Sequence, residues 1–349
     1  MQTTPARSPG PSVPPPPQAR LGLLAIFGST FLELVGYFML TPLLILRLKD
    51  DGVSTAMAGV FAATGWLGVF LMTPFASAVT RRLGRRPTLW LAALIPTVAT
   101  AGFALSPLLG VWFALKLAAG MASGLRWVLA EAVVAEFSPP GQRGRMVGLF
   151  ETMVGVTFVV GPGLLAWVGP QSDAAIWIAF GFMVVGLLWS LLIPRLPAAP
   201  DAHEARVGLG GVWHAVLAHP MVMAVGFVGG FFESGLTAIL PLYGLALGLG
   251  ATLAALLVSA SGLGSALMML PAGLLADRMG HHPQQRWGNE AQARHTLMRV
   301  CAWITLGATV AIPFVAGTPW LAAPVAFVWG GAGGCLYTVA MIDIGSREE

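Results

Sequence analysis

Repeated apolar runs of about 20 residues constrain the fold of this chain more than any other feature of its sequence. A helix that crosses a membrane needs about 20 apolar residues at a rise of 1.5 Å each. Because 56% of the 349 residues are hydrophobic and only 10% are charged, a soluble globular domain, with roughly 25% charged residues, is excluded. The sequence therefore predicts an all-α integral membrane protein. Ten spans are expected, at residues 21–46, 56–79, 87–106, 110–137, 146–168, 174–194, 221–248, 252–276, 300–317 and 320–344.

The basic residues of the expected loops indicate an orientation. If the N-terminus is cytoplasmic, the tails and the loops after the second, fourth, sixth and eighth spans carry fifteen of the 19 Lys and Arg residues. The loops on the opposite side carry only Arg47 and Lys49. Cytoplasmic loops are enriched in Lys and Arg. We therefore expect a multi-pass protein of the inner (plasma) membrane with both termini in the cytoplasm.

The composition and motifs exclude several classes of protein. Lysine occurs only as Lys49 and Lys116, and neither is followed by Ser or Thr, so the sequence contains no nucleotide-binding P-loop. The net charge of +4 is too small to indicate a nucleic-acid-binding face. Cys301 and Cys335 lack the spacing of a metal site, and no GxSxG or HExxH motif occurs. We expect no enzyme, no metal or other cofactor, and no nucleic-acid partner.

The second half of the sequence repeats features of the first half. Phe31-Leu-Glu33 in the first span recurs as Phe231-Phe-Glu233 in the seventh, and a proline follows each within nine residues. Parallel repeats of this kind are typical of transporters. The expected domains are a disordered proline-rich cytoplasmic tail (1–20), an N-terminal half of six helices (21–196), a cytoplasmic linker (197–220) and an incomplete C-terminal half of four helices (221–349).

A second repeated sequence follows the second and eighth spans. The later copy, Gly273-Leu-Leu-Ala-Asp277-Arg278-Met-Gly280, resembles the G-x-L-A-D-R-x-G loop of the major facilitator superfamily (MFS). Lys116-x-x-x-Gly120 is similar to an R-x-x-x-G element of that family. The resemblance implies a bundle of two parallel repeats of membrane helices that transports a solute by alternating access. The first copy matches the motif at Arg82, Gly84, Arg85 and Arg86.

The sequence departs from this family in two ways. The family normally has twelve spans, so the chain is expected to be truncated after its tenth. The first loop also has Arg81 where the family has an aspartate. The resemblance therefore implies that Asp277 alone keeps the family's cytoplasmic latch, lying close to the start of the fifth span.

Six charged residues fall inside the expected spans, away from the ends where Glu136 and Asp343 lie, and a charge at the membrane centre costs roughly 2.5–3.5 kcal/mol. In the resembled family, spans one, four, seven and ten line a central cavity, which assigns Glu33, Arg126, Glu131 and Glu233 to proton coupling or to substrate binding. Desolvation there favours the neutral form of a carboxyl group. The alternative is a structural ion pair that involves Lys116 or Arg126. Glu151, the remaining charged residue, is expected near the start of its own helix, where its carboxylate would be stabilised by the positive end of the helix dipole.

The leading functional hypothesis is a secondary active transporter that moves a small organic solute, coupled to protons. Gly161-Pro162-Gly163 is similar to part of an antiporter motif of the family and slightly favours export. The expected partners are therefore a small-molecule substrate, protons and the lipid bilayer. The alternatives are a uniporter or importer whose carboxylates are structural, and a truncated product that does not transport.

Overall fold

The computed structural model describes residues 17–139, 142–194, 209–218, 251–281, 290–315 and 318–346, together with residues 220, 223–224 and 243. Every element in this described part of the chain is helical. The elements are α1 (Pro17–Asp50), α2 (Thr55–Met72), the 3-10 helix η1 (Thr73–Phe75), α3 (Ala76–Leu83), α4 (Arg85–Leu105), α5 (Leu109–Phe137), α6 (Arg143–Val168), α7 (Ala174–Ser190), α8 (Leu209–Ala218), α11 (Ala251–His281), α12 (Glu290–Val315) and α13 (Pro319–Ser346).

Each expected span that the structure describes corresponds to helical structure, although some boundaries differ. Eight helices are long and apolar enough to cross a membrane, and α7 is a shorter apolar helix. Together they account for every expected span except 221–248, which contains Glu233 and lies almost entirely outside the described residues. The chain is thus an all-α protein with several membrane-spanning helices. The count of ten spans stays a prediction.

Several features differ from the expected ones. α1 begins at Pro17, inside the predicted tail, and α8 lies inside the predicted linker. The expected second span does not continue as one helix, because Pro74 near the start of η1 separates α2 from α3. Proline lacks a backbone N–H and disfavours a continuous helix at this point. Gly84 then ends α3 with φ +85°, a conformation that side chains rarely adopt, which accounts for a glycine in this loop.

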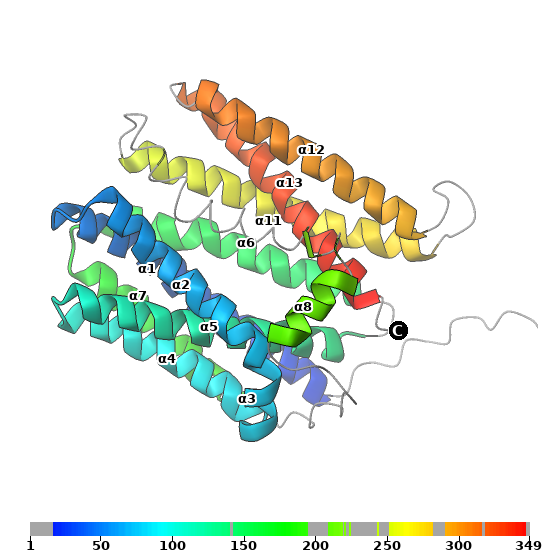
Figure 1. Ribbon diagram of the computed structural model, residues 1–349, viewed down its shortest axis with the longest axis horizontal. Helices are drawn as coiled ribbons and strands as arrows, with labels where there is room; N and C mark the ends of the chain where they lie inside the picture. The colour runs from blue at the N-terminus through cyan, green and yellow to red at the C-terminus, as the bar shows by residue number, and fades with distance from the viewer. Residues whose placement is uncertain are drawn as a thin grey trace, which may run out of the picture.

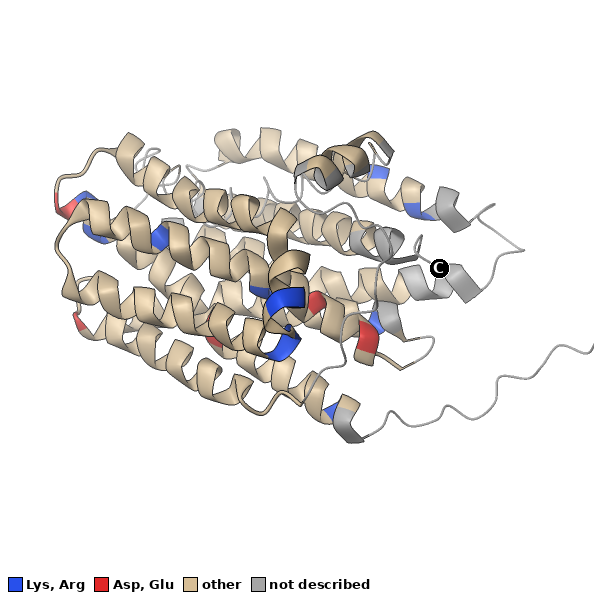
Figure 2. Cartoon of the chain, turned by 60° about the horizontal axis from the view of Figure 1, so that its bottom comes forward, with Lys and Arg blue, Asp and Glu red and all other residues tan. Residues whose placement is uncertain are grey.

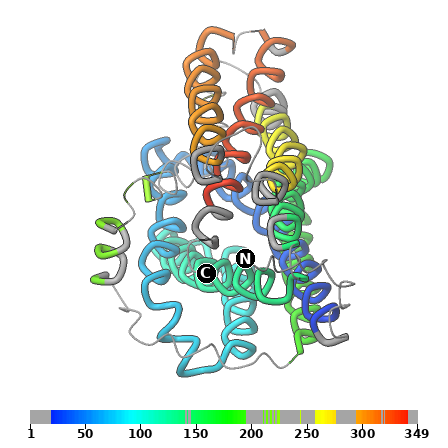
Figure 3. The backbone as a smooth tube through the Cα atoms, turned by 90° about the vertical axis from the view of Figure 1, so that its right-hand side faces the viewer, coloured from blue at the N-terminus to red at the C-terminus, as the bar shows by residue number. Residues whose placement is uncertain are grey.

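The helices form two packed groups, with α6 between them (Figure 1). In the first group, α1 packs on α7, α2 on α5, and α4 on α5. In the second group, α11 packs on α13, and α13 packs on α12. Figure 3 shows α12 and α13 at the opposite edge of the bundle from α4. Because α6 contacts both α1 and α11, it joins the N-terminal helices to the C-terminal ones.

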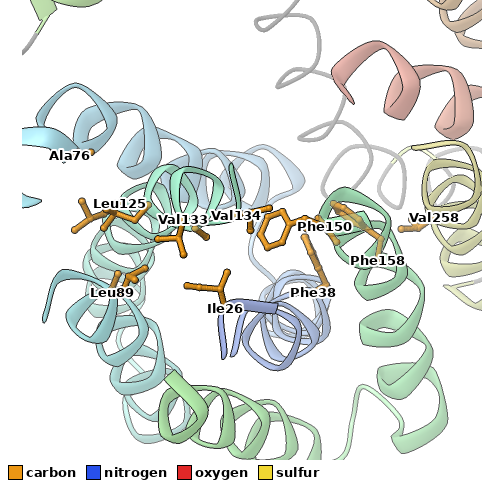
Figure 4. Close-up of a cluster of buried hydrophobic side chains, with 14 of the residues drawn as sticks. Ile26, Phe38, Ala76, Leu89, Leu125, Val133, Val134, Phe150, Phe158 and Val258 are labelled. Carbon is orange, nitrogen blue, oxygen red and sulfur yellow. The ribbon is translucent and has the colours of Figure 1, made fainter. Parts of the chain in front are cut away.

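Small residues bring α6 and α11 close together. A Cβ atom on Gly155 would lie 2.7 Å from the Cα atom of Ala266, so the two helices touch backbone to backbone there. Small residues at a helix interface allow this approach. Next to it, aromatic rings extend the packing into α1, where the ring centroids of Phe38 and Phe158 are 3.9 Å apart. Figure 4 shows these rings with Phe150 beside them and Val258 beyond Phe158.

A second glycine contact joins α2 to α5. A Cβ atom on Gly120 would overlap the carbonyl oxygen of Gly65, and one on Gly124 would lie 3.0 Å from Val69.

The outer faces of the helices are apolar, and Figure 2 shows long stretches without a charged residue. Phe314 is 83% exposed and Trp303 is 72% exposed on α12. Exposed apolar surface of this extent fits a lipid environment.

Candidate functional site

A cavity of about 400 Å³ lies among the N-terminal helices and reaches α13. It falls in the size range of small-molecule sites, roughly 300–1,000 Å³. Its lining is mostly apolar and aromatic, with a single acidic and a single basic residue among the described lining side chains. The lining residues are Thr30, Glu33, Leu34, Tyr37 and Phe38 of α1, Trp66 and Val69 of α2, Thr73 of η1, Ser123, Gly124, Arg126, Trp127, Val128 and Ala130 of α5, Phe150 of α6, and Tyr337 of α13.

The two charged lining residues form an ion pair. Nε of Arg126 lies 2.6 Å from Oε2 of Glu33, and the side chains are only 4% and 7% exposed. Both residues lie well inside their helices, so apolar neighbours rather than loops surround them. At this depth each charge needs the other, because a buried charge without a partner is costly.

Arg126 also uses its other nitrogens inside the same group of helices. Nη2 donates to Oγ of Ser29 on α1 at 2.9 Å, and Nη1 donates to the backbone carbonyl of Leu89 on α4 at 3.5 Å. One guanidinium therefore connects α1, α4 and α5. A planar group with five N–H donors suits such a position.

Glu131 lies one turn further along α5, toward its end at Phe137. Its Oε1 accepts a hydrogen bond from Nε1 of Trp127 at 2.6 Å and one from the hydroxyl of Tyr337 at 3.1 Å. Glu131 is half-buried and is not among the residues that line the cavity, whereas both donors are. Trp127 and Tyr337 thus separate the cavity from Glu131 and connect α5 to α13.

Lys116 is a third charged residue on α5, and it is only 4% exposed. Its Nζ lies 5.0 Å from the ring centroid of Tyr37 and 5.8 Å from that of Phe61. Both distances are within the range of cation–π attraction. The sequence left open whether Lys116 or Arg126 forms a structural ion pair. In the structure Arg126 pairs with Glu33, and Lys116 does not.

The first signature loop connects helix ends. Nη1 of Arg85 lies 2.6 Å from Oε2 of Glu136 at the end of α5, and Nη2 of Arg86 donates to the backbone carbonyl of Leu191 at 3.0 Å. Arg81 and Arg82 are exposed. This copy of the motif therefore holds α4 against its neighbours at one end of the bundle.

The second signature copy lies within α11. Gly273 is close to the start of α6, because a Cβ atom on Gly148 would lie 3.5 Å from the Cα atom of Gly273. Asp277, Arg278 and Gly280 follow on the same helix, but their side-chain surroundings lie outside what the structure describes. The latch at Asp277 stays a prediction, and so does any role of Glu233.

The expectation for Glu151 is wrong. α6 begins at Arg143 and has no acidic residue in its first turn, so Glu151 lies more than two turns inside the helix. The effect of the helix dipole falls off within the first turn. Glu151 is 2% exposed and is therefore a buried residue rather than a residue at a helix end.

Sequence reasoning missed Ser29, Trp127 and Tyr337. Tyr337 gives one usable signal, since it is one of only three tyrosines in the chain and interrupts a span rich in glycine and alanine.

No group of three or more His, Cys, Asp or Glu residues among the described ones could hold a metal ion.

These features define a multi-pass helical membrane protein with a cavity among its N-terminal helices that α13 also borders. Its sequence matches the Major Facilitator Superfamily over residues 26–347, and the chain belongs to that family. The human organic anion transporter MFSD10 (TETRAN) shares the fold, with a TM-score of 0.69 over 94% of this chain and 86% of that one, at 18% identity.

Three curated relatives are more similar in sequence. The uncharacterized MFS-type transporter YfkF of Bacillus subtilis is 25% identical over 244 residues, which is 69% of this chain and 62% of YfkF. The tetracycline resistance protein, class C, of Escherichia coli is 34% identical over 40% of this chain and 36% of that protein. The quinolone resistance protein NorA of Staphylococcus aureus is 22% identical over 41% and 37%. Each match spans less than two thirds of the relative.

Proposed function

We propose that this chain is a secondary active transporter that moves a small organic solute by alternating access, coupled to protons and in the direction of export. The observation that carries the proposal is the cavity among the N-terminal helices, which Tyr337 of α13 also lines, with Glu33 in its wall and Glu131 hydrogen-bonded to two of its lining residues. A solute site bounded by both halves is exposed to one side at a time when the halves move. The names of the tetracycline and quinolone resistance relatives support export.

The carboxylates supply the proposed coupling. When Glu33 takes up a proton, its neutral carboxyl group no longer attracts the guanidinium of Arg126 by charge, and the ion pair weakens. Glu131 is held by uncharged donors from both halves. A proton on either residue therefore changes the contacts around the cavity.

A uniporter is the second candidate, and one observation favours it. The Glu33–Arg126 pair lies wholly among α1, α4 and α5, where it holds helices together. A carboxylate that serves only this purpose does not exchange protons during transport. In that case solute equilibrates but does not accumulate.

Flux into proteoliposomes tests the proposal against this alternative. Tetracycline and a fluoroquinolone are the first probes, given the names of the relatives. With an acidic lumen, a proton antiporter accumulates the probe above its external concentration, and collapsing the pH gradient abolishes the accumulation. Equilibration that ignores the gradient identifies a uniporter. Protein-free vesicles correct for passive entry of the probe.

The proposed orientation has the start of α1 and the end of α13 in the cytoplasm of a cell whose inner membrane holds the protein. The excess of Arg on the loops at that side supports it. Labelling of a single cysteine near Arg20 in intact cells and in inverted vesicles tests this orientation directly.

A further inference from the structure

The wall of the cavity is rich in aromatic rings. Six aromatic side chains from α1, α2, α5, α6 and α13 line it, and the set is Tyr37, Phe38, Trp66, Trp127, Phe150 and Tyr337. Flat rings favour stacked or edge-to-face contact with another ring over contact with a saturated group. The aromatic rings of the wall therefore favour a flat aromatic solute.

The charges on the wall cancel. Glu33 and Arg126 are the charged residues among the described lining ones, and they are paired at 2.6 Å. A charged solute that enters an apolar cavity needs a free counter-charge, because burying an unpaired charge is costly. A wall residue can supply that counter-charge only if the Glu33–Arg126 ion pair breaks, and the other member of the pair is then left unpaired.

The two charged residues just outside the wall also cancel. Lys116 is basic, Glu131 is acidic, and each has partners in the aromatic residues of the wall. The ammonium of Lys116 contacts the rings of Tyr37 and Phe61, while the carboxylate of Glu131 accepts hydrogen bonds from Trp127 and Tyr337. Neither side chain lines the cavity, and the two opposite charges together add no net charge around it.

An uncharged polar group is available in the wall. Oγ1 of Thr30 is buried and has no hydrogen-bond partner among the described residues, and Thr30 is 5% exposed. A buried hydroxyl without a partner gains from a hydrogen bond to a ligand. An amide, carbonyl or hydroxyl group on the solute fits this requirement without bringing a charge.

We propose that the cavity selects flat aromatic solutes that carry no net charge, with the ring against the aromatic wall and a neutral polar substituent near Thr30. The proposal rests on the proposed function, since it takes the cavity to be the site of the transported solute. It concerns binding, however, and is measured without transport.

Equilibrium dialysis against the full chain in lipid nanodiscs tests the proposal with four matched probes. They are 1-naphthamide, 1-naphthoate, 1-naphthylmethylammonium and the saturated amide decahydronaphthalene-1-carboxamide. We expect 1-naphthamide to bind at least about tenfold more tightly than each of the other three. Equal or tighter binding of an ion or of the saturated amide overturns the proposal, and so does the failure of all four to bind.

Variants separate the two parts of the proposal. Glu33→Gln leaves the guanidinium of Arg126 without its counter-charge, so binding of 1-naphthoate should rise at least about fivefold. The double variant Glu33→Gln/Arg126→Gln removes both charges and should restore the preference for the neutral probe, which also controls for misfolding. If the single variant folds and gains no affinity for 1-naphthoate, the ion pair does not set the selectivity.

The aromatic wall has a matched control. Trp127→Leu removes a ring from the cavity and should weaken 1-naphthamide at least about fivefold. Trp167→Leu makes the same change at a residue of α6 that is 83% exposed and should leave binding unchanged. Tight binding without flux in proteoliposomes would overturn the proposed function alone. Flux with a preference for the cationic probe would overturn the selectivity alone.

Discussion

The hydroxyl of Tyr337 on α13 lies 3.1 Å from Oε1 of Glu131 on α5, and 206 positions of the sequence separate the two residues. The bond thus crosses from the C-terminal group of helices to the N-terminal group. Trp127 donates to the same oxygen from within α5. A hydrogen bond to a charged carboxylate is stronger than one between neutral groups. Since separation of α13 from α5 breaks it, this bond stabilises the observed arrangement of the two groups.

Replacing Tyr337 by Phe should favour separation of α13 from α5. The loss of one hydrogen bond to a charged group amounts to about 1.5–3 kcal/mol. We expect Ser123→Cys in the cavity wall to react several-fold faster with a membrane-impermeant thiol reagent, in a background with Cys301 and Cys335 replaced by Ser. Right-side-out and inverted vesicles show from which side the reagent enters.

Tyr37→Phe is the matched control for that experiment. Tyr37 also lines the cavity, but it lies on α1, within the N-terminal group. Its replacement should leave the labelling rate of Ser123→Cys unchanged. An equal increase in both variants would contradict the role assigned to Tyr337.

Glu33→Gln tests coupling. The amide keeps a similar volume and removes the titratable group, so accumulation driven by a pH gradient should collapse while solute binding persists. The measurement is uptake into proteoliposomes with an acidic lumen, compared with equilibrium dialysis on the same preparation. A variant that still concentrates solute against its gradient would show that Glu33 is structural.

Arg126→Met should destabilise the protein strongly. Removing one partner of a buried pair costs about 3–5 kcal/mol, because the other charge is left buried and alone. Glu33→Gln in the same chain removes that charge and should recover most of the loss. Thermal unfolding in nanodiscs measures both variants. If the double variant is no more stable than Arg126→Met, the bonds of Arg126 to Ser29 and Leu89 carry the stability instead.

Gly120→Ala should separate α2 from α5. The added methyl group overlaps the carbonyl oxygen of Gly65, so the helices must move apart and lose packing, at a cost of about 1–3 kcal/mol. Gly110→Ala lies on the same helix with no heavy atom within 4 Å of the added carbon. Its melting temperature should stay the same or rise. Similar losses in both variants would point to a general effect of alanine in α5.

Asp277→Asn tests the expected latch between α11 and the start of α6. If the carboxylate complements the free N–H groups at that helix start, its loss weakens the contact by about 0.3–1 kcal/mol. A cysteine pair at Gly148 and Gly273 reports the approach of the two helices through its rate of disulfide formation. The rate should fall in Asp277→Asn, and Glu136→Gln at the end of α5 serves as the control. An unchanged rate would mean that Asp277 is a solvated acid.

The sequence predicted the helices well because hydropathy and length determine which segments cross a membrane. Its errors include one helix end and one break inside a span. α12 begins at Glu290, well before the expected residue 300, because polar residues can continue a helix beyond the hydrocarbon layer. The break at Pro74 was missed because the segment is apolar throughout.

The site was predicted as a set of buried charges, with an ion pair of Lys116 or Arg126 as the alternative and no acidic partner named. Their depth followed from helix length, but which acid meets Arg126 depends on the rotation of α1 against α5, and sequence spacing on one helix does not determine that rotation. Tyr337 was missed for a similar reason, since an aromatic residue in a membrane span usually contributes only to helix packing. Its hydroxyl has a partner only because α13 lies beside α5.

The connections that Arg126 makes have a practical consequence for anyone who wants to observe this protein at work. One side chain ties α1, α4 and α5 together, and the glycine contact adds α2 to the same unit. Spectroscopic labels placed within that unit should record nearly constant separations throughout the cycle. Labels that pair α5 with α13 span the Tyr337–Glu131 bond, and their distance is the coordinate along which the cycle should be followed.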